Sequence, residues 1–291
     1  MLKEYAEFCY NQVGSYVLDV VQYFEDLRPQ LSKAGIDISL PEYLSMMFFT
    51  IGLVGLFTLT IGGTAMVLMS GIAGIMMAFI ASIVLSVVTA LGFYIYPSIM
   101  ISSRASKIKD TLPFATMYLA TLSGTGTPLP KIFENLSEVD EYGEVSKEAK
   151  NISRDINTFG MDVSEALERS ANRSPSEDYK ELMWGINHVI TTGGSLRDFL
   201  NQRAESLMND YKRRIEEFSE QLSLLVEMYI TVVVVGSIIF TSMSAVMSTI
   251  SQNMTPDQIV AIQIGAIFFG LPLISAMFII LVQGMAPGGI R

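Results

Sequence analysis

The residue types best suited to catalysis or metal binding are scarce in this chain, which contains one cysteine, Cys9, and one histidine, His188. A metal cluster needs several such ligands at short spacing, and an activated nucleophile needs a base close by. His188 falls in a predicted helix beside Trp184 and Thr191, where a structural histidine is favoured over a catalytic base. We therefore predict no catalytic residue, no metal site and no bound cofactor.

Two glycine pairs are further candidates for chemistry, because glycine-rich loops bind phosphate groups in nucleotide-binding proteins. Gly124 and Gly126 form one pair, and Gly193 and Gly194 form the other. A phosphate-binding loop follows a strand and carries a Gly-Lys-Ser/Thr sequence, and neither pair has that context. Both pairs are better interpreted as turns between helices, so we expect no ATPase activity within this chain.

The composition indicates a polytopic membrane protein. Half of the 291 residues are apolar (50%), 16% are charged and the mean hydropathy is +0.42. Residues 43–103 contain no charged residue, and residues 228–290 contain only Asp257. Each run exceeds the roughly 20 apolar residues that cross a bilayer. The net charge of −10 argues against nucleic acid as a partner, since phosphate binding needs clustered Lys and Arg.

Each apolar run is too long for a single span. A helix over residues 43–103 would measure about 92 Å, against a hydrocarbon core of roughly 30 Å. We place the turn of the first run between Gly62-Gly63 and Gly71-x-x-Gly74, although three shorter spans remain geometrically possible. The turn of the second run is placed at 251–257. The four predicted spans are 43–66, 72–99, 228–250 and 259–283.

The basic residues define the orientation of these spans. Residues 1–42 contain three, residues 104–227 contain fifteen, and Arg291 is the last of the nineteen. With four spans, all nineteen fall on one side of the membrane. The positive-inside rule then predicts that both termini and the central segment lie in the cytoplasm, with the protein in the cell membrane.

The central segment carries helix signals throughout. Thr127-Pro128, Asp162 and Ser174-Pro175 are typical helix starts, and Gly160 suits a helix end. The six predicted helices are 107–124, 128–137, 144–158, 162–172, 176–192 and 195–226.

The last of these helices is predicted to run into the third span as one rigid rod. An apolar stripe of spacing three and four begins at Leu196, and no helix breaker separates residue 226 from the span that follows. We expect the two glycine turns, at 124–126 and 193–195, to lie at the membrane-distal tip. A push applied there would then reach the membrane through helices.

The predicted fold class is all-α: a polytopic membrane protein with four transmembrane helices and a cytoplasmic six-helix bundle. An amphipathic acidic segment precedes the first span, and we expect it to pack on the protein rather than on anionic lipid. The five predicted regions are an N-terminal segment 1–42, a transmembrane hairpin 43–103, a cytoplasmic bundle 104–227, a second hairpin 228–284 and a tail 285–291.

The spans contain little that would conduct ions. Small residues recur every four positions from Gly74 to Ala90 and from Ser237 to Thr249; such stripes either hold the spans together or receive a foreign helix or second protomer. Glu227, at a span boundary, is either a solvated interfacial residue or a partner for another helix's polar group. A pump or channel acting alone is therefore disfavoured.

Three motifs of the central segment resemble the type II secretion F domain. Segment 125–134 (TGTPLPKIFE) resembles its first turn, 159–167 (FGMDVSEAL) a central element, and Ser174-Pro175 with 192–200 (TGGSLRDFL) its closing block. The resemblance covers residues 110–245, and the flanking spans fit in number and position. Within that family the arrangement is similar to TadC-like and FlaJ-like platform proteins of type IV filament machines.

This resemblance implies an inner-membrane platform that couples a cytoplasmic hexameric secretion ATPase to the assembly of pilin-like subunits. Many relatives contain two such domains and this chain shows one, which implies pairing with itself or with a paralogue. The candidate partner-binding residues are Gly126, Pro128, Arg169, Arg173, Gly193, Gly194, Arg197 and Glu227. Two alternatives remain: a transporter or channel subunit with a regulatory bundle, and a membrane-bound scaffold.

Overall fold

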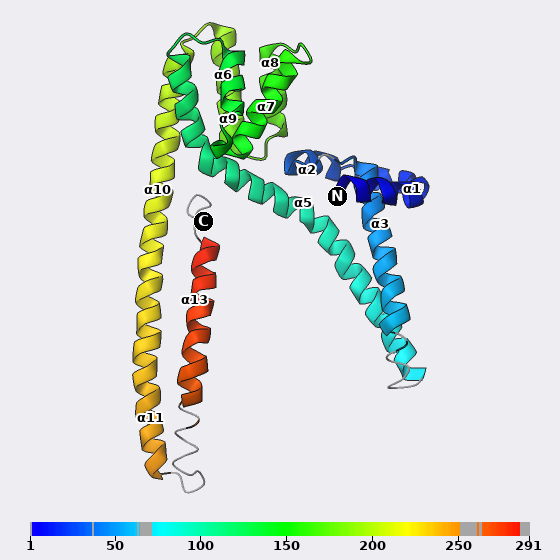
Figure 1. Cartoon of the computed structure of the whole chain (residues 1–291), viewed down its shortest axis with the longest axis vertical. Helices are drawn as coiled ribbons and strands as arrows, with labels where there is room; N and C mark the ends of the chain where they lie inside the picture. Colours follow the sequence, from blue (N-terminus) through cyan, green and yellow to red (C-terminus); the bar gives the residue numbers. More distant parts are fainter. Residues whose placement is uncertain are drawn as a thin grey trace. The chain divides into compact units, whose positions relative to one another are not determined.

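The computed structural model describes residues 2–36, 38–62, 64, 72–250, 261 and 264–285. These residues form helices and no strand, which confirms the predicted all-α class (Figure 1). Four of the described helices are long and apolar enough to cross a membrane. The chain divides into two compact units, Met1–Leu200 and Asn201–Arg291.

The first unit contains a helical hairpin of two candidate spans. Helix α3 (Leu40–Phe57) continues as a π turn (Thr58–Gly62), and α5 (Ile72–Ser123) returns. The hydroxyl of Ser82 donates to the carbonyl of Gly55 at 3.2 Å. A Cβ on Gly55 would lie 3.3 Å from Oγ of Ser86, so the small residues of α5 let the two backbones approach closely. This contact supports the interpretation that the small-residue stripe of α5 holds the hairpin together.

The N-terminal segment packs against the start of this hairpin, as expected. Helix α1 (Leu2–Val21) lies across the first turns of α3 and continues through a 3-10 turn (Gln22–Phe24) into α2 (Leu27–Ala34), which packs beside α5 (Figure 1). Ala6 and Cys9 are buried with Met46 in one apolar cluster. Ser39 and Glu42 form a capping box at the start of α3, in which the backbone N–H of Ser39 donates to the Glu42 carboxylate at 2.8 Å.

The bundle is built from the end of α5 and the start of α10 (Leu196–Ile230) together with four shorter helices. These are α6 (Leu129–Ser137), α7 (Glu144–Asn157), α8 (Val163–Arg173) and α9 (Glu177–Thr192), with a 3-10 turn at Asp140–Tyr142. Its core contains the fully buried side chains of Ile108, Phe133, Ile152, Leu167 and Leu182.

Four of the predicted helix starts lie one residue too early: the helices begin at Leu129, Val163, Glu177 and Leu196. Pro128 is the N-cap of α6 rather than its first residue. Ser176, and not Ser174, caps α9, since its side chain accepts from the backbone N–H of Tyr179 at 3.4 Å. In both places the N-cap residue has extended dihedrals, and the helix begins one residue after it. Asp162 caps α8 as predicted.

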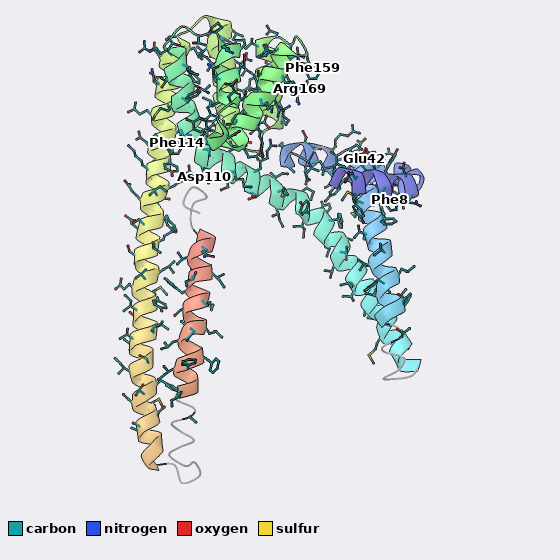
Figure 2. The ribbon with its side chains drawn as sticks, viewed as in Figure 1. Phe8, Glu42, Asp110, Phe114, Phe159 and Arg169 are labelled. Atoms are coloured by element: carbon teal, nitrogen blue, oxygen red, sulfur yellow. The ribbon has the colours of Figure 1, made fainter. Side chains whose placement is uncertain are left out.

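Helix α5 joins its span to the bundle without a loop. It runs over 52 residues and contains Pro97 and Pro113. Figure 2 places Asp110 and Phe114, on either side of Pro113, where α5 turns into the bundle. Proline removes a backbone hydrogen bond and clashes with the preceding turn, so Pro113 accounts for this bend.

The second unit contains the other two candidate spans. Helix α10 begins in the first unit, continues through a π turn (Thr231–Val235) into α11 (Gly236–Ile250), and is helical without interruption over Leu196–Val246. A second π turn (Ala266–Gly270) leads into α13 (Leu271–Met285). Tyr229 and Ser275 share a hydrogen bond of 2.9 Å between their hydroxyls, which joins α10 to α13. The predicted turn at 251–257 lies outside the described residues, as does most of the turn between the first two spans.

Candidate functional site: the ion network around Glu148

Glu148 is the most completely buried charged residue of the bundle. It lies on the inner face of α7 among Val145, Ala149 and Ile152, and its side chain is 0% exposed. A buried carboxylate is costly unless cations and hydrogen bonds compensate for its lost hydration. The surrounding helices must therefore supply those partners.

Two arginines supply them. Nη2 of Arg104 donates to Oε1 of Glu148 at 2.5 Å, and Nη2 of Arg173 donates to Oε2 at 2.9 Å. Nε of Arg104 also donates to Oε2 of Glu144 at 2.9 Å. Arg104, Glu144, Glu148 and Arg173 are hereafter called the Glu148 ion network. It joins the end of the second span to α7 and α8, because Arg104 is the first charged residue after the apolar run.

Hydrogen bonds extend the network to two more helices. Nη1 of Arg104 donates to the backbone carbonyl of Lys33, at the end of α2, at 3.0 Å. The hydroxyl of Ser170 lies 3.3 Å from the Glu148 carboxylate and 2.9 Å from the hydroxyl of Tyr179 on α9. The network thereby ties five helices together at the level where the chain leaves its apolar segment.

The pKa values of Glu144, Arg173 and Tyr179 are shifted by their surroundings in and beside the network. Partial burial raises the pKa of Glu144, but hydrogen bonds from Lys147 and Arg104 outweigh it, so the net pKa of the carboxyl is lowered. Burial lowers the pKa of Arg173, and the charge of Glu148 more than offsets it, so the net pKa is raised. Burial, and then the charge of Glu148, raises the pKa of Tyr179. The Arg173 guanidinium and the Glu144 carboxylate therefore stay charged at neutral pH.

We expect Glu144 to make the bundle sensitive to acid. Its lowered pKa in the folded state contributes stability that is fully present above the ordinary glutamate pKa of about 4.3. That contribution is lost as the pH falls through the lowered pKa of Glu144 in the folded state. The Glu144→Gln variant should therefore lose less stability than the parent between about pH 5 and about pH 3, as measured by thermal unfolding of the full chain. The control is Glu134→Gln, on an exposed pair with Lys131, and an equal loss in Glu144→Gln and the parent would contradict the prediction.

The described contacts of this site join helices to one another. Both oxygens of Glu148 accept hydrogen bonds from arginine, and the side chain is fully buried. Within the described part of the chain, no group of three or more His, Cys, Asp or Glu side chains is arranged to hold a metal ion. The network is suited to fixing helices in place, since breaking it would leave buried charges unpaired.

The two glycine turns lie close together at one end of the bundle. Gly126 (φ 76°) and Gly193 (φ 75°) have the left-handed backbone that favours glycine, and Gly193 ends α9 as its C-cap. A Cβ on Gly124 would lie 3.4 Å from Nε of Arg197, which places the first turn beside the start of α10. Exposed candidate residues at these turns are Gly126, Pro128, Gly193, Gly194 and Arg197.

The absence of a side chain at Gly185 lets the first turn of α10 pack closely against α9. A Cβ on Gly185 of α9 would overlap the ring of Phe199, which lies in the first turn of α10. Phe199 therefore packs directly on the backbone of α9, next to the second glycine turn.

The other three candidate residues are not brought to these turns. Arg169 is half-exposed on α8, with Nε 4.0 Å from the carboxylate of buried Asp155, and Figure 2 shows it on the outer part of the bundle. Arg173 belongs to the Glu148 ion network, so its charge is already paired within the bundle. Glu227 is exposed on α10, in the second unit.

Arg104, Glu144 and Glu148 are not among the predicted site residues. One signal was available, because Glu148 falls at helical spacing with Val145, Ala149 and Ile152 and so interrupts an apolar face. A charge on a buried face requires partners, but the pattern does not say which residues provide them.

Comparisons with known proteins match this chain to one family model and to several archaeal relatives. The family model of protein F of the type II secretion system matches residues 115–244. The chain is 33% identical over 264 residues to an uncharacterized protein of Methanocaldococcus jannaschii, covering 88% of this chain and 42% of that protein. It is 27% identical over 146 residues to flagella accessory protein J of the same organism, covering 50% of this chain and 25% of that protein.

A second flagella accessory protein J, from Methanococcus voltae, is 25% identical over 139 residues, covering 47% of this chain and 25% of that protein. The chain spans less than half the length of each of these relatives. No solved structure matches it. The matched segment contains α6–α9 and three members of the Glu148 ion network. These matches confirm the resemblance of the central segment to protein F of the type II secretion system and to flagella accessory protein J.

Proposed function

We propose that this protein is a non-enzymatic membrane platform of a type IV filament or type II secretion machine. In this role it transmits the conformational work of a cytoplasmic hexameric ATPase to the insertion or extraction of pilin-like subunits. The F-family domain and the relatives named flagella accessory protein J support this class of function.

One observation carries the relay role: the helix over Leu196–Val246 passes from the bundle segment into an apolar span without a loop. Helix α5 does the same in the opposite chain direction. A flexible joint would absorb a displacement, whereas a continuous helix transmits it, because bending would strain consecutive backbone hydrogen bonds.

The exposed glycine turns are the proposed contact with the ATPase. They lie at the end of the bundle where α5 stops and α10 starts, so a push there acts on both continuous helices. Arg197, exposed beside Gly124, is the cation we propose for this contact. Arg169, half-exposed on α8 away from the turns, is proposed as a separate cation that faces the ATPase. Glu227 and the stripe on α11 are proposed to face pilin-like subunits or a second copy of the chain, or a paralogue.

The topology we propose follows from the distribution of basic residues. The regions 1–42, 104–227 and 285–291 lie in the cytoplasm, and the hairpins 43–103 and 228–284 lie in the cell membrane. All nineteen Lys and Arg residues are then on the cytoplasmic side.

Photocrosslinking tests the ATPase contact directly. A photoreactive residue placed at position 126 or 194 should capture a hexameric secretion ATPase in cells, identified by mass spectrometry. The control position is 234, an exposed residue of the apolar third span, which should capture no ATPase. Capture of the ATPase from 234 alone, or solute flux in proteoliposomes that contain only this chain, would contradict the proposal.

A further inference from the structure

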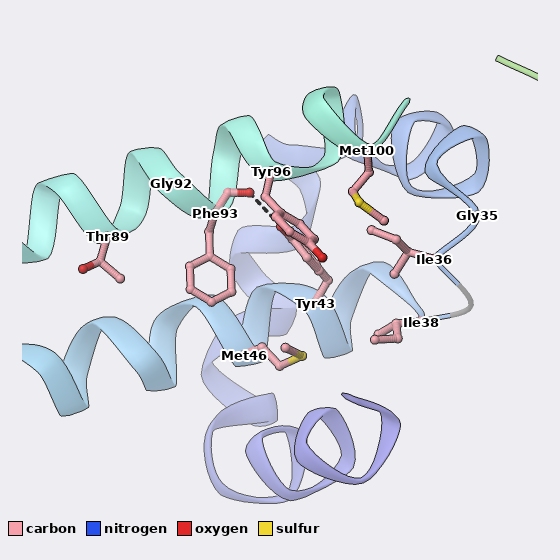
Figure 3. Close-up of a pocket in the computed structure, with 10 residues that line it drawn as sticks. All are labelled: Gly35, Ile36, Ile38, Tyr43, Met46, Thr89, Gly92, Phe93, Tyr96 and Met100. Atoms are coloured by element: carbon pink, nitrogen blue, oxygen red, sulfur yellow. Dashed lines mark hydrogen bonds between the residues drawn. The ribbon is translucent and has the colours of Figure 1, made fainter. Parts of the chain in front are cut away.

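An apolar pocket of about 710 Å³ opens between α3 and α5 in the first unit. Figure 3 shows Phe93, Tyr96 and Met100 of α5 facing Tyr43 and Met46 of α3, with Ile36 and Ile38 closing one end. The hydroxyl of Tyr43 donates to the backbone carbonyl of Phe93 at 2.7 Å, so that polar group is already satisfied. The remaining wall is mostly aliphatic and aromatic, and its hydroxyls are those of Thr89, which donates to the carbonyl of Leu85 at 2.8 Å, and Tyr96. The pocket volume lies in the range of ligand-binding pockets.

A second pocket, of about 600 Å³ and strongly basic, adjoins the first. The two share Gly35, Ile36 and Met100 in their walls. The six basic side chains that line the second pocket are Arg104, Lys107, Lys147, Lys150, Arg154 and Arg173. Its acidic side chains are Glu144 and Glu148.

The positive charge of this basic pocket is only partly used inside the protein. Arg104 and Arg173 are paired with Glu148, and Lys147 with Glu144. Lys107 and Lys150 form no ion pair or side-chain hydrogen bond with another described residue. In a chain of net charge −10, this is a local surplus of cations that an anion would satisfy.

The two pockets lie on either side of the membrane boundary that the sequence defines. Seven of the ten residues that line the apolar pocket come from the uncharged run 43–103, and the basic pocket contains Arg104, the first charge after that run. Hydrocarbon therefore surrounds one pocket, and water and head groups surround the other.

We propose that the adjoining pockets bind one anionic phospholipid, with its phosphate against Lys107 and Lys150 and an acyl chain between α3 and α5. The basic pocket alone would fit a soluble phosphate, but it opens into an apolar space that only an amphiphile fills. A bilayer presents both chemical parts of such a ligand at this depth. The lipid would join the first hairpin to the base of the bundle beside the Glu148 ion network, and the site does not depend on the proposed function.

Native mass spectrometry of the full chain in detergent tests this site, with phosphatidylglycerol and phosphatidylcholine as the two lipid probes. The parent protein should bind phosphatidylglycerol more tightly than phosphatidylcholine. The double variant Lys107→Gln/Lys150→Gln removes two positive charges and should weaken phosphatidylglycerol binding roughly 30-fold. That factor corresponds to the usual contribution of two cations to binding an anionic head group. Gly92→Leu should weaken binding of both lipids, because a Cβ on Gly92 starts in open space in the wall of the apolar pocket.

Matched controls separate this site from general effects on the protein. Lys212→Gln removes a charge elsewhere, and Gly52→Leu adds the same side chain to α3 in open space outside the pocket, so both should bind like the parent. Equal affinity of the parent for the two lipids would overturn the proposal, as would unchanged binding in either test variant. Displacement of phosphatidylglycerol by millimolar inorganic phosphate, with Gly92→Leu still binding normally, would assign the basic pocket to a soluble anion instead.

Discussion

Replacing Glu148 with alanine should lower the free energy of unfolding by about 3–5 kcal/mol, the usual cost of removing one partner from a buried ion pair. The substitution leaves Arg104 and Arg173, with side chains 11% and 21% exposed, facing each other without their shared counter-ion. It also removes the acceptor near Ser170. Thermal or denaturant unfolding of the full chain in detergent, followed by far-UV circular dichroism, measures the change.

Two further variants show whether unpaired charge is the cause. Glu134→Ala removes a carboxylate from an exposed ion pair, and its stability should remain close to that of the parent because exposed pairs contribute little. The triple variant Arg104→Met/Glu148→Leu/Arg173→Met removes all three charges and should recover much of the lost stability. A Glu148→Ala protein as stable as the parent would show that the network does not hold the bundle together.

Placing proline in the middle of α10 should abolish filament assembly while the protein remains in the membrane. Ser219→Pro removes a backbone hydrogen bond in the helix interior and bends it, at a cost of about 3 kcal/mol or more. Ser219 is exposed, so no core contact is lost with its side chain. Under the relay mechanism, a bend here separates motion at the glycine turns from motion of the third span.

Filaments counted by electron microscopy, with membrane fractions probed by immunoblot, provide the readout for this variant. Ser219→Ala keeps the helix intact and should assemble filaments at the parent level. Normal assembly by Ser219→Pro at normal membrane abundance would contradict transmission through α10. Loss of assembly in both variants would point to the side chain of Ser219 rather than to the continuity of the helix.

The bundle helices follow closely from the sequence because their signals are local. Asp162 caps α8, Gly193 ends α9, and the apolar stripe that begins at Leu196 follows α10. The predicted starts of α6 and α9 lie one residue before the observed ones, because a proline fits both the N-cap and the positions next to it. Each of these features depends on residues within one or two turns, which is why spacing alone captures it.

The Glu148 ion network could not be predicted in the same way. Arg104 and Glu148 are 44 residues apart, and Glu148 and Arg173 are 25 residues apart. Partners at that separation are brought together by packing of whole helices, which leaves no periodic signal in the sequence. The same holds for the pocket between α3 and α5. Its walls combine the first turns of α3 with a segment of α5 that is distant in the sequence but adjacent in the fold.

The π turn at Thr231–Val235 also left no signal in the sequence, yet it changes the direction of the third span's side chains. A π turn fits one extra residue into a helix, and each residue of an α-helix advances about 100° around the axis. Ser237, Thr241 and Ala245 therefore point about a quarter-turn away from where an unbroken α10 would aim them. The azimuth of this stripe is thus set independently of the apolar stripe below it. Deleting one residue from the turn would re-aim the stripe toward different neighbours without altering a single side chain of α10 or α11.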